Sequence, residues 1–277
     1  MRISLTNENE GRSKPMTRVG QIAWVLLAAA GLMAMTGFAT FAVGLDRLAL
    51  WQVVQGCVAD FKLTGAPFPC LEVNLAGGEA RGDVVLRPPL THDMILAPTR
   101  EIVGLEDPFL QSPYAPNYFD AAWRARSLLK GAGGRRPDRD EVALVVNSAF
   151  VRTQDQLHIH VGCLRASLQR TIAAAAPHVP IGEWEQLRAI VPHRTFWGTR
   201  VDGTDLADVD PFRLAVRALA DKVTDLRKAM IMVAGIRVAG EDGFLILATY
   251  AGAPQSWPVG ADDVFEPRCS AQTRLGE

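Results

Sequence analysis

The stretch Val142-Ala143-Leu144-Val145-Val146-Asn147, followed by Gln156-Leu157-His158-Ile159-His160-Val161, decides the fold of this chain. Both runs are rich in β-branched and aliphatic residues, which favours strands, and a short polar loop joins them. Because side chains alternate along a strand, we expect Gln156, His158 and His160 on one face and Leu157, Ile159 and Val161 in a core. Two of the five histidines of the chain stand in this run, and that placement indicates a chemical role.

Working outward, the same reasoning predicts strands and helices on both sides of this pair. Further strands are expected at 83–87, 93–97, 231–238 and 244–249, the last two joined across Gly240–Gly243. Helices are expected over 46–62 and over 117–130, where Asn117 is a good N-cap. A third helix should begin at Asp210-Pro211, with an apolar stripe of Phe212, Val216, Leu219, Val223, Leu226 and Met230. The order predicts an α+β fold: a mostly antiparallel sheet with flanking helices.

Charge excludes one class of partner. The chain has 277 residues, a net charge of −1 and a pI near 6.5. Nucleic-acid-binding proteins usually carry a basic face, so no nucleic-acid partner is expected.

The first 45 residues differ in kind from the rest. No charged side chain occurs from Val19 to Leu45, and this run of 27 residues is rich in Ala, Leu, Val, Met and Phe. About 20 such residues suffice to cross a bilayer as a helix. A cleaved signal peptide is the alternative, but its apolar region is normally shorter, and Ala39-Thr40-Phe41-Ala42 lacks the small-x-small cleavage pattern. We therefore expect residues 19–45 to be a transmembrane anchor.

The charges on either side of this segment predict its orientation. Arg2, Arg12, Lys14 and Arg18 precede it, which by the positive-inside rule keeps the tail 1–18 in the cytoplasm. Residues 46–277 would then form an exported domain, in the periplasm of a bacterium and anchored in the inner membrane by a single span.

All four cysteines fall within the predicted exported domain. An even number of cysteines in an oxidising compartment suits disulfides, for which three connectivities are possible. We favour Cys57–Cys70, which closes a local Pro-rich loop, and Cys163–Cys269, which ties the tail to the histidine strand. A zinc site is the alternative, but no CxxC spacing supports it.

Residue types alone leave three interpretations of the two histidines open. They can be a nucleophile with an assisting donor, two metal ligands, or a structural pair satisfied by hydrogen bonds. A metal site needs further ligands, and no other histidine of the chain shows a recognisable ligand spacing.

A resemblance separates these interpretations. Asn147, the loop Thr153-Gln154-Asp155, and the run from Gln156 to Cys163 resemble the histidine-triad (HIT) superfamily. More narrowly, the chain is similar to the membrane-anchored CDP-diacylglycerol pyrophosphatase family, in Met94–Pro108, in Asn117–Arg126, in the cysteine positions and in the N-terminal apolar run.

The resemblance implies hydrolysis of CDP-diacylglycerol, a lipid nucleotide, to CMP and phosphatidate, with no metal and no other cofactor. It makes His158 the nucleophile that forms a nucleotidyl-histidine intermediate. It makes His160, Thr153 and Asn147 hydrogen-bond donors to the phosphate oxygens, which would stabilise the transition state.

The chain departs from the superfamily at one position. The pattern begins with a histidine where this chain has Gln156, and glutamine forms hydrogen bonds but does not titrate. Gln156 can still orient the ring of His158 through hydrogen bonds, but it cannot act as an acid or a base. Two rivals follow: another nucleotidyl hydrolase or transferase of the HIT type, and a non-catalytic exported binding module.

Overall fold

The computed structural model describes residues 46–89, 91, 93–188, 190–191, 194–252, 259–266 and 269. The chain divides into two compact units, Met1–Asp46 and Arg47–Glu277, and every described residue except Asp46 belongs to the second. The predicted tail 1–18 and anchor 19–45 lie outside the described residues. Among the residues that are described, no helix is both long enough and apolar enough to cross a membrane.

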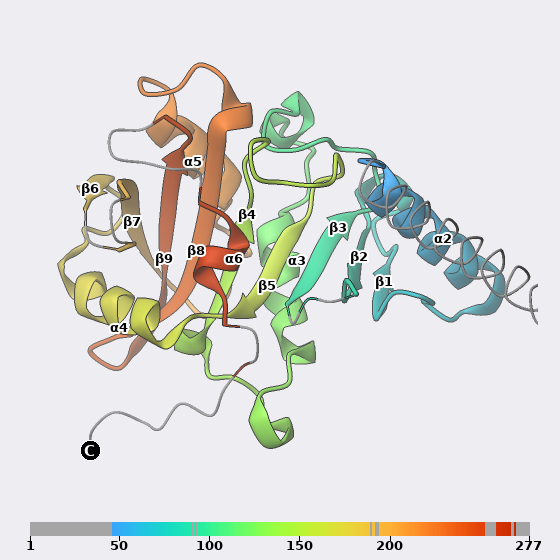
Figure 1. Ribbon diagram of the computed structural model, residues 1–277, viewed down its shortest axis with the longest axis horizontal. Helices are drawn as coiled ribbons and strands as arrows, with labels where there is room; N and C mark the ends of the chain where they lie inside the picture. Colours follow the sequence, from blue (N-terminus) through green and yellow to red (C-terminus); the bar gives the residue numbers. More distant parts are fainter. Residues whose placement is uncertain are drawn as a thin grey trace, which may run out of the picture. The chain divides into compact units, whose positions relative to one another are not determined.

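A nine-stranded antiparallel sheet organises the second unit (Figure 1). Its strands follow the spatial order β1-β2-β3-β5-β4-β8-β9-β7-β6. Their bounds are β1 (Glu72–Asn74), β2 (Asp83–Leu86), β3 (Met94–Pro98), β4 (Val142–Val146), β5 (Ile159–Cys163), β6 (Glu185–Leu187), β7 (Phe196–Asp202), β8 (Ala229–Val238) and β9 (Glu241–Tyr250). The predicted class, a mostly antiparallel sheet with flanking helices, is confirmed.

Helices cover both faces of this sheet. In Figure 1, α3 (Tyr118–Ala125) and α5 (Pro211–Leu219) lie behind it and complete the largest apolar cluster. On the other face, α2 (Ala49–Thr64) packs over β2 and β3, whereas α4 (Ala166–Ala175) and α6 (Ala261–Val264) pack over β4, β8 and β9. This second face therefore carries two separate apolar clusters, one beneath α2 and one beneath α4 and α6.

The pairing of the two strands that open the sequence analysis is confirmed, with one change of boundary. Strands β4 and β5 are antiparallel neighbours, with Val145 opposite His160. However, β5 begins at Ile159 and not at Gln156. The backbone of Leu157 donates instead to the carbonyl of Ile102, in the segment that follows β3, so the chain enters the sheet later than its residue pattern predicts.

The predicted third helix is too long. Helix α5 ends at Leu219, and Met230 lies in β8, opposite Thr249. The side chain of Asp225 accepts a hydrogen bond from the backbone of Arg227 and caps a short 3₁₀ helix, which separates α5 from the strand. The apolar stripe continues past Leu219 in the sequence because α5 and β8 both bury apolar residues. The helix does so with a period of about 3.6 residues and the strand with a period of two.

Two smaller boundaries also differ from the prediction. Helix α3 ends at Ala125 and continues only as a 3₁₀ turn over Arg126–Leu128. The β8–β9 turn consists of Ala239 and Gly240, with φ angles of 52° and 89°, so the residues from Glu241 onward belong to β9. Positive φ at both central residues is the requirement of a tight hairpin turn whose twist matches the strands.

Both favoured disulfides are present. Cys57 in α2 is bonded to Cys70, and Cys163 at the end of β5 is bonded to Cys269. The first bond holds the loop after α2 against that helix. The second ties residue 269 to the strand that carries the histidines.

Candidate active site

The two histidines lie at the border between the apolar clusters of the second sheet face. His160 in β5 is opposite Ile95 of β3, which belongs to the α2 cluster, and opposite Val145 of β4, which belongs to the α4 cluster. The rings of His158 and His160 meet edge to face, with centroids 4.9 Å apart. Strand β5 and the residue just before it therefore bring both imidazoles together, as the sequence predicts.

His158 is held in one tautomer. Its Nδ1 lies 2.7 Å from the backbone oxygen of Gln156. A carbonyl oxygen only accepts hydrogen bonds, so Nδ1 carries the proton and Nε2 keeps its lone pair. The residue as a whole is 8% exposed. Burial, reinforced by the charge of His160, lowers the pKa of His158 to about 3. His158 is thus a neutral imidazole at any ordinary pH, the form that can attack phosphorus.

His160 has a partner at each ring nitrogen. Its Nδ1 donates to Oδ2 of Asp93 at 2.6 Å, and its Nε2 lies 3.3 Å from Nδ2 of Asn147. The orientation of the Asn147 amide follows from its other end, because Oδ1 accepts from the backbone of Ala261 at 3.0 Å. Asn147 thus links the end of β4 to the start of α6 and to His160.

Asp93 is the site residue that sequence reasoning missed. It immediately precedes β3 and lies beside His160 because β3 and β5 pair. Burial acts to raise the pKa of Asp93, but the hydrogen bonds from His160 and Thr91 and the attraction to His160 outweigh it and lower the pKa. No spacing in the sequence reveals this contact, since 67 residues separate the two partners.

Gln156 is fully buried and acts through the backbone. Its Nε2 donates to the carbonyls of Pro98 at 2.9 Å and Arg100 at 3.0 Å, and its Oε1 accepts from the backbone of Ile102 at 3.3 Å. An amide supplies two donors and one acceptor, whereas a neutral imidazole has only one donor. Glutamine therefore matches this segment better than histidine would, and it fixes the carbonyl that orients His158.

Thr153 is the residue whose hydroxyl is predicted to contact the substrate phosphate. It is exposed in the loop between β4 and β5, and among the described residues it makes no hydrogen bond to either ring. Its predicted contact with a substrate phosphate stays a prediction.

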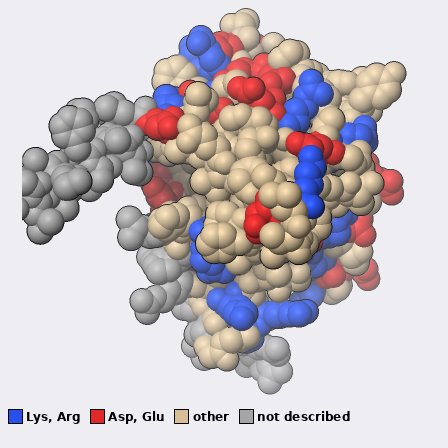
Figure 2. All heavy atoms as spheres, turned by 90° about the vertical axis from the view of Figure 1, so that its right-hand side faces the viewer, with Lys and Arg blue, Asp and Glu red and all other residues tan. Residues whose placement is uncertain are grey.

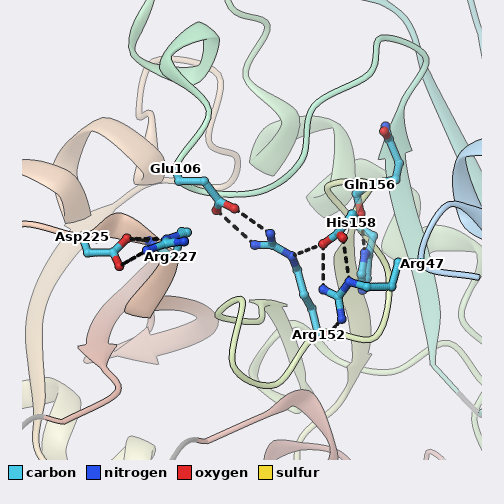
Figure 3. A network of polar contacts seen from close by, with 8 residues as sticks. Arg47, Glu106, Arg152, Gln156, His158, Asp225 and Arg227 are labelled. Atoms are coloured by element: carbon cyan, nitrogen blue, oxygen red, sulfur yellow. Dashed lines mark hydrogen bonds and ion pairs between the residues drawn. The ribbon is translucent and has the colours of Figure 1, made fainter. Parts of the chain in front are cut away.

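A network of ion pairs fixes this loop (Figure 3). The guanidinium of Arg152, itself buried, pairs with both oxygens of Glu106 at 3.0 and 2.5 Å, and its Nε lies 3.3 Å from Asp155. Asp155 also binds Arg47 at 2.6 and 2.7 Å, and the side chain of Gln154 accepts from the backbone of Leu50 at 2.8 Å. The loop that leads into His158 is thereby tied to the first turn of α2.

The described part of the chain contains no group of three or more His, Cys, Asp or Glu side chains placed to hold a metal ion. A cavity of about 740 Å³ lies elsewhere, between α4 and β6, and is lined by residues such as Arg170, Thr171 and Arg188. It shares no residue with the histidine site.

Comparison with known proteins gives this geometry a family. The profile of the family described as CDP-diacylglycerol pyrophosphatase matches residues 45–273. The chain belongs to the CDP-diacylglycerol pyrophosphatase family. Its relatives include the CDP-diacylglycerol pyrophosphatase of Yersinia pestis, 32% identical over 82% of this chain and 86% of the relative. The protein of the same name from Mycobacterium bovis BCG Pasteur is 33% identical over 81% of this chain and 84% of its own length. The family is one of hydrolases, and its profile spans every residue that the structure describes, from Asp46 to Cys269.

Proposed function

We propose that this chain hydrolyses the pyrophosphate bond of CDP-diacylglycerol to CMP and phosphatidate, with His158 as the nucleophile. One observation carries the proposal: a neutral imidazole whose Nδ1 proton is fixed on the Gln156 carbonyl, so that Nε2 is the nucleophilic atom. The family membership supplies the substrate.

In the first step, Nε2 of His158 attacks the phosphorus on the CMP side. The bond between that phosphorus and the bridging oxygen breaks, and phosphatidate leaves with the electron pair. The new N–P bond places positive charge on the ring, and the Gln156 carbonyl stabilises this charge through the Nδ1 proton. In the second step, water attacks the same phosphorus, the N–P bond breaks, CMP is released and neutral His158 is restored.

Asn147 and His160 would hold the phosphate oxygens. The Asn147 amide nitrogen has two hydrogens: one faces the lone pair of His160 Nε2, and the other is free of this contact. If the ring becomes protonated, Nε2 would give up the contact with Asn147 and donate to a phosphate oxygen, while Asp93 compensates the charge from the other side. These donors would stabilise the charge that develops on the phosphate in the transition state.

The test is to trap the intermediate. The full chain is mixed with CDP-diacylglycerol labelled in the cytidine, quenched in alkali because phosphoramidates are labile in acid, and digested for mass spectrometry. We expect a CMP adduct on the peptide that carries His158. The adduct and the release of CMP should be absent in His158→Ala and retained in His178→Ala, which alters an exposed histidine of the chain. Release of CMP by His158→Ala at the wild-type rate would exclude this nucleophile.

The same assay addresses the two rivals. If alcohols added to the reaction accept the nucleotide in place of water, the chain is a transferase. If neither adduct nor CMP forms with CDP-diacylglycerol or with other nucleotide diphosphates, it is a non-catalytic module.

The proposal includes a location. The uncharged run 19–45 would anchor the chain in the inner membrane, with residues 1–18 in the cytoplasm and the hydrolase domain in the periplasm. The two disulfides are consistent with an oxidising compartment. Protease added to intact spheroplasts should digest the domain, and digestion only after lysis would contradict this orientation.

A further inference from the structure

The outer side of α2 lacks the charges that a solvent-exposed helix normally has. The residues of α2 and its N-cap that are most exposed at helical spacing are Leu48, Gln52, Gly56, Ala59 and Leu63. They fall on one stripe because they are separated by three or four positions. A surface helix of a globular protein usually presents charged residues on this side. Here the stripe is neutral over its whole length and begins and ends with leucine.

The loop after α2 extends this neutral side with exposed apolar side chains. The relative exposure of Leu63 is 85%, that of Phe68 is 76% and that of Leu71 is 45%. The Cys57–Cys70 disulfide holds the loop against the helix, so these side chains stay beside the C-terminal end of α2. We call the stripe and these loop residues together the α2 surface. Figure 2, which views the molecule from the side of α2, shows a broad and mostly uncharged area, interrupted near the centre by acidic atoms.

The sequence around the α2 surface indicates what covers it. From Leu48 to Leu71 the only charged residues are Asp60 and Lys62, and Lys62 is paired with Glu79. The uncharged run 19–45 ends immediately before Asp46, where the described part of the chain begins. An exposed apolar surface that follows a membrane-length apolar segment by so few residues matches the surface of a lipid bilayer.

We propose that the α2 surface docks on the lipid bilayer and holds the catalytic loop at the membrane surface. The loop is coupled to α2 by the Arg47–Asp155 ion pair and by the Leu50–Gln154 hydrogen bond, and it leads directly into His158. The same loop exposes Phe150, at 59% relative exposure, as a further apolar contact. The inference rests on the proposed function in two respects: the substrate is a lipid whose acyl chains stay in the bilayer, and residues 19–45 anchor the chain there.

The test separates docking from chemistry by using two substrates in the same proteoliposomes. The full chain is reconstituted in phosphatidylcholine vesicles with the domain facing outward. Turnover is measured on CDP-dioleoylglycerol within the vesicles and on CDP-dihexanoylglycerol dissolved below its critical micelle concentration. For the double variant Leu63→Asp/Phe68→Asp we expect turnover of the membrane substrate to fall at least about tenfold, and turnover of the dissolved one to change by less than about twofold. The matched control, Ile181→Asp, changes an apolar residue of 54% exposure outside the α2 surface and should affect neither substrate.

A second measurement does not depend on activity. Vesicles that contain a phospholipid with a diazirine close to its headgroup are irradiated, and cross-linked peptides are identified. We expect lipid adducts within 63–71 in the wild type and their loss in the double variant. If the double variant does not fold, the milder variant Phe68→Ser replaces it, and its adducts within 63–71 should decrease.

Three outcomes would overturn the proposal: equal loss on both substrates, no loss on the membrane substrate, or a wild type without lipid adducts in 63–71. A change of oligomeric state in the double variant would assign the α2 surface to a second copy of the chain instead. A wild type inactive on both substrates would exclude the proposed function, while the cross-linking would still test docking.

Discussion

Nδ1 of His160 lies 2.6 Å from Oδ2 of Asp93, although 67 residues separate them in the chain. The contact exists because β3 and β5 are neighbours in the sheet, which places the residue before β3 beside the second residue of β5. It fixes the tautomer of His160, because the carboxylate of Asp93 accepts the proton on Nδ1.

Replacing Asp93 should therefore impair catalysis without removing the nucleophile. In Asp93→Asn the ring of His160 loses its anionic partner, and we expect kcat/KM on CDP-diacylglycerol to fall by about 100-fold, within the range of acid–base contributions. The pH dependence of kcat/KM should change as well, because the pKa of Asp93 is lowered by its contact with His160 and asparagine does not titrate.

The control for this experiment is Asp262→Asn, which removes an exposed carboxylate from α6, the helix that contacts Asn147. Its kcat/KM and pH profile should match the wild type. If Asp93→Asn kept both the rate and the profile, Asp93 would have a purely structural role.

Restoring a histidine at the first triad position should harm this protein. In Gln156→His, at least one of the carbonyls of Pro98 and Arg100 loses its donor, and a buried unpaired acceptor costs about 1–3 kcal/mol. We expect a lower free energy of unfolding in urea, and lower activity because the Gln156 carbonyl that orients His158 is no longer fixed. An increase in activity with unchanged stability would show that the glutamine is a catalytic defect and not a structural adaptation.

The stability of the protein should fall as the pH decreases below about 6.5, the ordinary value for histidine. The pKa of His158 is lowered to about 3 by burial, so between these two values the unfolded chain binds a proton at this position and the folded chain does not. Stability from this group is present above pH 6.5 and is lost as the pH falls, with a slope of up to about 1.4 kcal/mol per pH unit.

Urea unfolding at a series of pH values measures this slope. His158→Gln removes the titrating group, so the variant should lose less stability between pH 6.5 and 4 than the wild type, while His178→Gln should behave as the wild type does. Parallel curves for the wild type and His158→Gln would mean that His158 is accessible to protons in the folded state.

The two disulfides should contribute unequally. Cys57 and Cys70 are 13 residues apart, whereas Cys163 and Cys269 are 106 apart. By the entropy of loop closure in the unfolded chain, the first bond is worth about 3 kcal/mol and the second about 4.7 kcal/mol. Unfolding of Cys57→Ala/Cys70→Ala and Cys163→Ala/Cys269→Ala in urea compares them directly. A larger loss in the first pair would show that native contacts, and not chain entropy, dominate.

The elements that the sequence predicted best are those with a single strong period. The prediction was correct within a few residues for β2, β3, β4, β8 and β9 and for the starts of α3 and α5. In each case an apolar run lies between turn or cap residues, and its periodicity indicates one type of secondary structure. The end of α5 was wrong because an apolar stripe continues across the change from helix to strand. The short edge strands β1 and β6 were missed, since three residues carry no usable pattern.

The sequence by itself determined that His158 and His160 lie close together, because only one residue separates them in the chain, and it determined the membrane-length apolar run at 19–45. Only the tertiary structure decided that Asp93 is hydrogen-bonded to His160, that Gln156 is hydrogen-bonded to the backbone after β3, and that Arg47, which precedes α2, holds the loop before His158 through Asp155. The physical reason is that hydrogen bonds between distant residues depend on which strands become neighbours. Which strands pair is decided by the burial of whole sheet faces. A short stretch of sequence therefore does not predict the pairing.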